Sequence, residues 1–120
     1  AEREGQWTKG KSYDGFGPMG PWLVTADEVA DPQALAMTLD VGEERRQDGS
    51  SATMIFGIAT LVSYLSEFMT LEPGDVVTTG TPPGVGLGMK PQVWLKDGDV
   101  MRLEIEGLGH QRQVVRVRQT

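Results

Sequence analysis

The residues with the clearest chemical potential form a loop rich in threonine and glycine, TTGTPPGVGLG, at positions 78–88. Threonine hydroxyls both donate and accept hydrogen bonds, and glycine lets a ligand come close to the backbone amides. The loop follows the segment 72–77, EPGDVV, which is typical of a tight turn leading into a strand. A loop of this composition at the end of a strand is suited to hold a small polar or anionic group.

Lys11 is the second chemical candidate, because it lies in the glycine-rich segment GKSYDGFGPMG at positions 10–20. An ammonium group on a flexible stem in such a turn could stabilise an enolate or a carboxylate. The alternative is an ordinary solvated lysine at the surface. The residues alone leave both interpretations open.

Several acidic residues could bind a hard cation, although most have an ordinary structural explanation. Asp75 and Asp99 follow glycine in tight turns, where a carboxylate commonly accepts hydrogen bonds from nearby backbone. Glu104 and Glu106 alternate with apolar residues, which is typical of a polar strand face, although the two could also form a metal-binding pair. Asp14 remains a possible oxygen ligand.

Two glycine patterns resemble nucleotide-binding motifs but lack the required context. The segment 15–20, GFGPMG, satisfies G-x-G-x-x-G, yet no strand precedes it and no helix follows. The segment 84–90, GVGLGMK, lacks the contiguous Gly-Lys-Ser/Thr of a Walker loop. We therefore expect neither a dinucleotide site nor a P-loop.

The composition excludes several classes of function. With 11 Lys and Arg against 17 Asp and Glu, the net charge of −6 does not suit a nucleic-acid backbone or an anionic lipid surface. The absence of cysteine excludes disulfides, thiolate metal sites and a cysteine nucleophile, and the single histidine, His110, is expected at the surface. No apolar run approaches the roughly 20 residues of a membrane span, and the charged start, AERE, does not resemble a signal peptide. We expect a cytoplasmic protein with neither a nucleic-acid nor a membrane partner.

The elements that must position these residues are mostly strands. We expect irregular backbone over 1–21, short strands at 22–25 and 72–77, and a half-buried strand at 35–41 with period-two alternation. Gly42-Glu43 would turn this strand back as a two-residue hairpin into a return arm at 44–47. Further strands are expected at 100–105 and 113–117.

One helix is predicted from about Ser51 to Phe68, because apolar residues recur at three- and four-residue steps. Ser50 or Ser51 would cap its start. The stripe consists of Ile55, Ile58, Ala59, Val62, Leu65 and Met69. The predicted fold class is mainly β with one α-helix packed on a sheet (α+β), in one domain spanning residues 1–120.

The chain resembles a known family over nearly all of residues 6–115, in three separated blocks, 10–33, 47–91 and 95–113, and in the stretch QWTKGKS at 6–12. The other characteristic stretches are GTPPGVGLGMKP and LKDGDVMRLEIEGLGHQRQ. Together they resemble the fumarylacetoacetate hydrolase family, and most closely its branch of ureidoglycolate lyases and 2,4-diketo-3-deoxy sugar acid hydrolases. The resemblance implies a rolled β-sheet fold, a homodimer, and Mg²⁺ or Mn²⁺ as cofactor. It also implies action on a 2-keto or 2,4-diketo acid, with C–C cleavage through a metal-stabilised enolate.

The resemblance also assigns roles to individual residues. Lys11 occupies the position of the family's active-site lysine, and Thr81 that of the residue that contacts the substrate carboxylate, with Thr79 and Gly80 shaping the loop. The stretch AERE at positions 1–4 is similar to a family segment that places Arg3 against the substrate.

The chain departs from the family pattern at its metal ligands. A Glu-x-Glu pair and a later Asp precede the lysine segment in the family, and no such segment is in this chain, so no metal ligand is assigned here. Gly15 stands where the family usually has Thr. The alternative to a metal-dependent hydrolase or lyase is therefore a non-catalytic, truncated β-scaffold that acts by self-association or binding.

Overall fold

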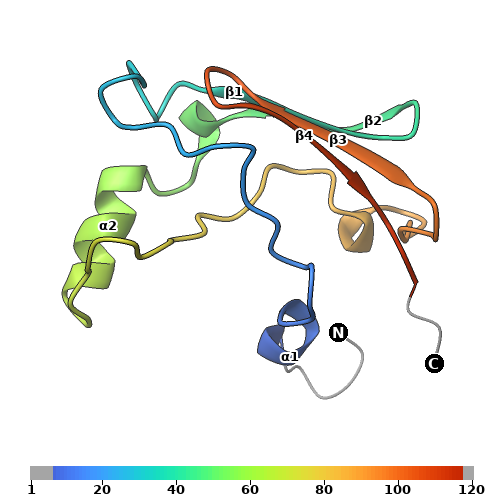
Figure 1. Cartoon of the computed structure of the whole chain (residues 1–120), viewed down its shortest axis with the longest axis horizontal. Coiled ribbons are helices and arrows are strands. Elements are labelled where there is room, and N and C mark those ends of the chain that lie inside the picture. Colours follow the sequence, from blue (N-terminus) through green and yellow to red (C-terminus); the bar gives the residue numbers. More distant parts are fainter. Residues whose placement is uncertain (1–6, 118–120) are drawn as a thin grey trace.

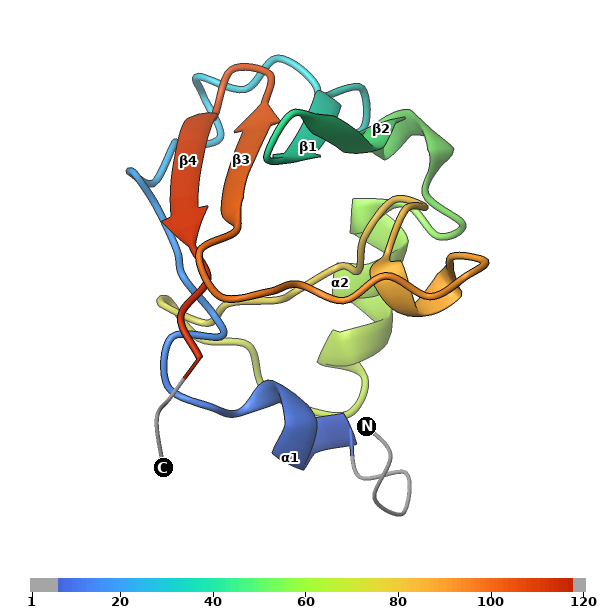
Figure 2. The ribbon, with the colours of Figure 1, turned by 90° about the vertical axis from the view of Figure 1, so that its right-hand side faces the viewer.

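The structure, a computed structural model, describes residues 7–117. A four-stranded antiparallel sheet forms one side of the molecule, and helix α1 lies on the opposite side (Figures 1 and 2). The segment from about 70 to 95 runs between them (Figure 2). In chain order the elements are α1 (Trp7–Lys11), β1 (Ala36–Val41), β2 (Glu44–Ser50), the 3₁₀ turn η1 (Ser51–Thr53), α2 (Ile58–Ser66), the 3₁₀ turn η2 (Gly86–Gly88), β3 (Val100–Ile105) and β4 (Gly109–Val114).

The sheet has the strand order β2-β1-β3-β4 with antiparallel neighbours throughout. The predicted hairpin is confirmed, since Val41 pairs with Glu44 and Gly42 takes the positive φ of 63° that a two-residue turn favours. Strand β2 extends beyond the predicted return arm to Ser50. The mainly β fold class with few helices is confirmed as well.

A β-bulge interrupts the pairing of β1 with β2. Leu39 pairs with Gln47 and the next residue, Asp40, pairs with Arg45, so Arg46 is the extra residue on β2. Successive side chains of a regular strand point to opposite faces, and a bulge breaks this alternation. The bulge therefore lets Arg46 and Gln47 turn toward the same side of the sheet.

The predicted helix exists but begins later than predicted. Residues 51–53 form η1, in which the Ser50 hydroxyl accepts a hydrogen bond from the Ala52 N–H at 3.2 Å, and α2 begins only at Ile58. Residues 54–57 separate the two, with Gly57 as the N-cap of α2, and the Ile58 N–H donates to the Gln33 side-chain oxygen at 2.8 Å. Glycine disfavours helix, and a cap from a residue 25 positions away is invisible in a local pattern. Ile55, assigned to the helical stripe, lies outside the helix and is 92% exposed.

Three strand predictions were wrong, in whole or in part. No strand forms at 22–25 or 72–77, and β4 lies at 109–114 rather than 113–117. The arm that contains Trp22 contacts β4 by side chains instead of a backbone ladder: Gln111 donates to the Gly20 carbonyl, and the Trp22 ring packs where Gly109 lacks a side chain. The expectation of irregular backbone over 1–21 was wrong for the short helix α1.

The described residues contain no fully buried hydrophobic side chain, and the only buried residue is Ser51. Large apolar residues are exposed over the N-terminal arm, the segment just before α2, α2 itself and the segment that follows it; examples are Trp7, Phe16, Leu23, Ile55, Phe56, Tyr64, Phe68 and Trp94. In this part of the chain no helix has the length and apolarity to cross a membrane.

Candidate functional site

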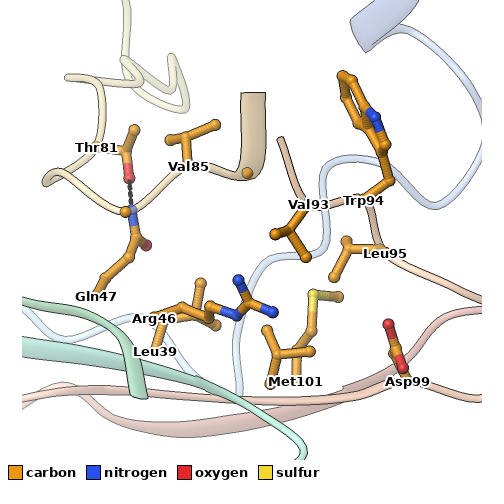
Figure 3. Close-up of a pocket in the computed structure, with 13 residues that line it drawn as sticks. Leu39, Arg46, Gln47, Thr81, Val85, Val93, Trp94, Leu95, Asp99 and Met101 are labelled. Carbon is orange, nitrogen blue, oxygen red and sulfur yellow. Dashed lines mark hydrogen bonds between the residues drawn. The ribbon is translucent and has the colours of Figure 1, made fainter. Parts of the chain in front are cut away.

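A hollow of about 220 Å³ lies between the inner face of the sheet and the segment 81–95 (Figure 3). Leu39 and Val41 of β1 and Met101 of β3 provide its apolar floor. The alternate residues Thr38 and Asp40 face the other side of the sheet. The remaining lining residues are Arg46, Gln47, Thr81, Gly84, Val85, Gly86, Val93, Trp94, Leu95 and Asp99.

Two glycines allow the predicted loop to pack directly on backbone. A Cβ atom at Gly84, where φ is +113°, would lie 1.9 Å from the Arg46 carbonyl oxygen. A Cβ at Gly86 would lie 1.8 Å from the Val93 carbonyl oxygen. Real Cβ atoms do not approach within 3.0 Å of such atoms, so only glycine permits these contacts. At Gly84 and Gly86, the space that we expected a ligand to use is therefore occupied by the backbone of Arg46 in β2 and of Val93.

Thr81 lies at the edge of the hollow and is held there by Gln47 (Figure 3). The Gln47 side-chain nitrogen donates to the Thr81 hydroxyl and to the Pro82 carbonyl, each at 2.8 Å. The sequence indicated Thr81 by its loop but gave no sign of Gln47. Gln47 reaches Thr81 in a strand whose pairing is shifted by the β-bulge, and a periodic sequence pattern does not reveal such a shift.

Arg46 places a guanidinium group at the apolar hollow, and sequence reasoning missed it as well. Its side chain is only 15% exposed, pairs with Glu44 at 3.1 Å and donates to the Met89 sulfur at 3.0 Å. Its Nε atom is buried with no hydrogen-bond partner among the described residues. The hollow is therefore largely apolar, with the Arg46 guanidinium and the Asp99 carboxylate among its lining groups.

The remaining predicted site residues lie outside this hollow. Lys11 ends α1, is exposed, and holds its ammonium nitrogen 5.8 Å from the centre of the Trp7 ring. Thr79 and Gly80 are exposed on the loop before Thr81, and Gly80 has a φ of +98° with open space around it. Arg3 lies outside the described residues. The structure thus brings Thr81 and Gln47 together, and Lys11 does not line the hollow that Thr81 lines.

The acidic residues of the tight turns have structural roles, as predicted. Asp75 accepts the Glu72 N–H at 2.8 Å, and Asp99 accepts the Lys96 N–H at 2.7 Å. Within residues 7–117 no group of three or more His, Asp or Glu side chains is arranged to hold a metal ion. The described residues therefore do not fit a resident divalent cation.

Two charged residues with shifted pKa values also lie away from the hollow. A hydrogen bond to Asp40 raises the pKa of the Arg45 guanidinium on the outer face of the sheet. A hydrogen bond from the Thr25 side chain lowers the pKa of Asp27 in the N-terminal arm. Neither residue lines the hollow.

Curated relatives match most of this chain in sequence, and solved structures share its fold. Proteins provisionally named hydrolases in Burkholderia multivorans and Burkholderia cenocepacia are both 61% identical over 116 residues, which is 96% of this chain and 41% of each relative. The chain thus spans about two fifths of the length of the curated relatives it matches.

The solved structures include a fumarylacetoacetate hydrolase from Exiguobacterium antarcticum, with 49% identity and a TM-score of 0.87 over 92% of this chain and 39% of that one. Maleylpyruvate hydrolase from Sphingobium sp. SYK-6, solved with manganese(II) and pyruvate, is 39% identical with a TM-score of 0.79, over 87% of this chain and 37% of its own. The sequence model described as fumarylacetoacetate (FAA) hydrolase C-terminal matches residues 1–116. The chain therefore belongs to the fumarylacetoacetate hydrolase family.

Proposed function

We propose that the complete protein is a hydrolase or lyase that cleaves a C–C bond in a 2-keto or 2,4-diketo acid. The observation that carries the proposal is the Thr81 hydroxyl, held by Gln47 at the edge of the hollow in a chain of this family. A maleylpyruvate hydrolase of the same family has been solved with pyruvate, which is a 2-keto acid. These findings support a small carboxylated substrate.

In this proposal the loop containing Thr79, Gly80 and Thr81 binds the substrate carboxylate, and Lys11 stabilises the negative charge that develops on the enolate. The roles of Lys11 and Arg3 depend on the family resemblance, and the exposed Lys11 ammonium is open to a ligand. Mg²⁺ or Mn²⁺ belongs to the proposal as a cofactor whose ligands lie outside the described residues.

The test is turnover of oxaloacetate and an acylpyruvate by the complete gene product. Lys11→Ala should lower kcat by about a hundredfold or more, since removing a group that stabilises a developing oxyanion has effects of that order. Lys9→Ala is the matched control, because Lys9 lies on the same short helix and is also exposed. Equal activity of the two variants would contradict the role of Lys11.

A second candidate function is self-association through the apolar surface, with a second copy of the chain as the partner. Large exposed residues such as Phe56, Tyr64 and Phe68 support it, because monomeric proteins rarely leave extensive apolar patches open to water. Light scattering should then show a dimer, as the resemblance to the family also implies. A stable monomer at micromolar concentration would contradict this candidate.

A further inference from the structure

We propose that Gln47 is a positioning residue that fixes the Thr81 hydroxyl as a hydrogen-bond donor to the substrate carboxylate. This inference rests on the function proposed above for the Thr81 loop. It goes beyond that function by naming a residue on β2 that acts through Thr81, and by giving the direction of the hydrogen bond.

The hydrogen-bond partners of Gln47 determine which end of its side-chain amide faces the loop. The same side-chain nitrogen lies 2.8 Å from the Thr81 Oγ1 atom and 2.8 Å from the Pro82 carbonyl oxygen. A carbonyl oxygen only accepts hydrogen bonds, so the group facing Pro82 must be the NH₂ end of the amide. The reversed amide would place two carbonyl oxygens against each other.

The Thr81 hydroxyl proton points away from Gln47. An amide NH₂ group has two hydrogens and no acceptor capacity, and here one hydrogen serves Thr81 and the other Pro82. The Thr81 oxygen is therefore the acceptor in its bond with Gln47, and its own proton must point to another group. Because Thr81 is exposed, that proton is available to a ligand, and a carboxylate is an acceptor only.

Close backbone contacts on both sides of Gln47 hold this residue against the loop. On one side of Gln47 the Arg46 carbonyl meets the bare Cα of Gly84, and on the other side Gly49 lies so close to Pro82 that a Cβ there would be 2.9 Å from the proline ring. Gln47 pairs directly with Leu39, which lines the hollow, so the Gln47 side chain points to the same face of the sheet. Because Gln47 is already half-buried, little conformational freedom remains to be lost when a ligand binds.

The experiment is a double-mutant cycle on pyruvate binding, measured by calorimetry on the complete gene product in a buffer that contains Mn²⁺. Gln47→Met keeps the length of the side chain but removes its donor, and it should raise the Kd for pyruvate about threefold to tenfold. In a Thr81→Val background the same change should have less than a twofold effect, because Gln47 acts through the Thr81 hydroxyl. A loss of equal size in both backgrounds would show a general structural role and overturn the inference.

The matched control is Gln92→Met. Gln92 donates its side-chain amide to the Leu87 carbonyl at 3.1 Å, so it also supports the loop but does not touch Thr81. Its replacement should leave the Kd for pyruvate within twofold. If Gln92→Met weakens binding as much as Gln47→Met, loop stiffness explains both effects and the inference fails.

A second variant, Gln47→Glu, reverses the polarity of the interaction at nearly constant shape. The introduced carboxylate would accept the Thr81 proton, compete with the ligand and repel its charge, so binding should weaken about tenfold to a hundredfold. For any keto acid that is turned over, the change in Gln47→Met should appear in KM with kcat nearly unchanged, as for an interaction made equally in ground and transition states. Tighter pyruvate binding by Gln47→Glu than by Gln47→Met would overturn the inference.

The outcomes separate this inference from the function on which it rests. If the unaltered protein binds no pyruvate and turns over no keto acid, the proposed function fails and the inference fails with it. If the unaltered protein binds pyruvate and Gln47→Met binds it equally well, only the role of Gln47 is wrong. A lower thermal stability of Gln47→Met does not affect the cycle, because each Kd is measured below the unfolding transition.

Discussion

Replacement of Gly84 by alanine tests the close packing of the loop on β2. The new Cβ would lie 1.9 Å from the Arg46 carbonyl oxygen and 3.0 Å from the Gln47 Cγ atom, so the two segments must separate by at least about 1 Å. Gly84 also has a φ of +113°, a conformation that costs a side-chain-bearing residue about 1–3 kcal/mol. Overpacking against backbone adds about 1–3 kcal/mol. We therefore expect Gly84→Ala to destabilise the protein by about 4 kcal/mol.

Substitutions at three other glycines separate the destabilisation caused by backbone strain from that caused by overpacking. Gly86→Ala meets the Val93 carbonyl oxygen at 1.8 Å without a positive φ, so it isolates overpacking and should cost about 2 kcal/mol. Gly74→Ala has a φ of +102° and open space, so it isolates backbone strain and should cost about 1–2 kcal/mol. Gly88→Ala has neither feature and should remain within about 0.5 kcal/mol of the unaltered protein.

The assay is urea unfolding of the four variants, followed by circular dichroism. Because the free energy of unfolding falls by about 2 kcal/mol per molar urea, Gly84→Ala should lower the urea concentration at the unfolding midpoint by about 2 M. Its effect should approach the sum of those at Gly86 and Gly74. If Gly84→Ala is no more destabilising than Gly74→Ala, the loop does not pack on the β2 backbone and the geometry of the hollow is wrong.

Three further predictions concern other parts of the described chain. Ser51→Ala removes the acceptor of the Leu35 N–H at 2.9 Å and the donor to the Pro32 carbonyl at 2.8 Å, and should cost about 2 kcal/mol in urea unfolding; an unchanged midpoint would contradict this. Asp99→Ala removes an exposed turn bond to the Lys96 N–H and should cost less, about 1 kcal/mol, by the same measurement. The 120-residue chain should bind Mg²⁺ only weakly in calorimetry, since its described residues offer no cluster of three ligands; tight one-to-one binding would refute that expectation.

Local patterns predicted the centre of the sheet well because its signals are local. The alternation of residues 35–41 and the glycine at position 42 determine a strand and its turn without reference to the rest of the chain. The helix boundary and the arm around Trp22 depend instead on long-range side-chain contacts, from Gln33 to Ile58 and from Trp22 to Gly109. Such contacts leave no periodic trace, so the helix was extended too far and the arm was mistaken for a strand.

The candidate site was predictable only where one short motif contains it. Thr81 lies in a loop whose composition is distinctive, and the structure places it at the edge of the hollow. Arg46 and Gln47 were not predicted, because alternation along β2 would send their side chains to opposite faces. Only the one-residue offset in pairing brings both to the hollow, and that offset is a property of two strands together.

The bulge also explains why the adjacent residues Arg46 and Gln47 make different contacts on the same face of the sheet. Arg46, the extra residue, turns its carbonyl toward Gly84 and its guanidinium toward Glu44 and Met89. Gln47 pairs with Leu39 in the regular part of the ladder, and its side chain donates a hydrogen bond to Thr81. Deletion of one residue from β2 would restore regular alternation and send one of the two side chains to the outer face. The direction of the Thr81 proton is thus determined by strand register as much as by the loop that carries it.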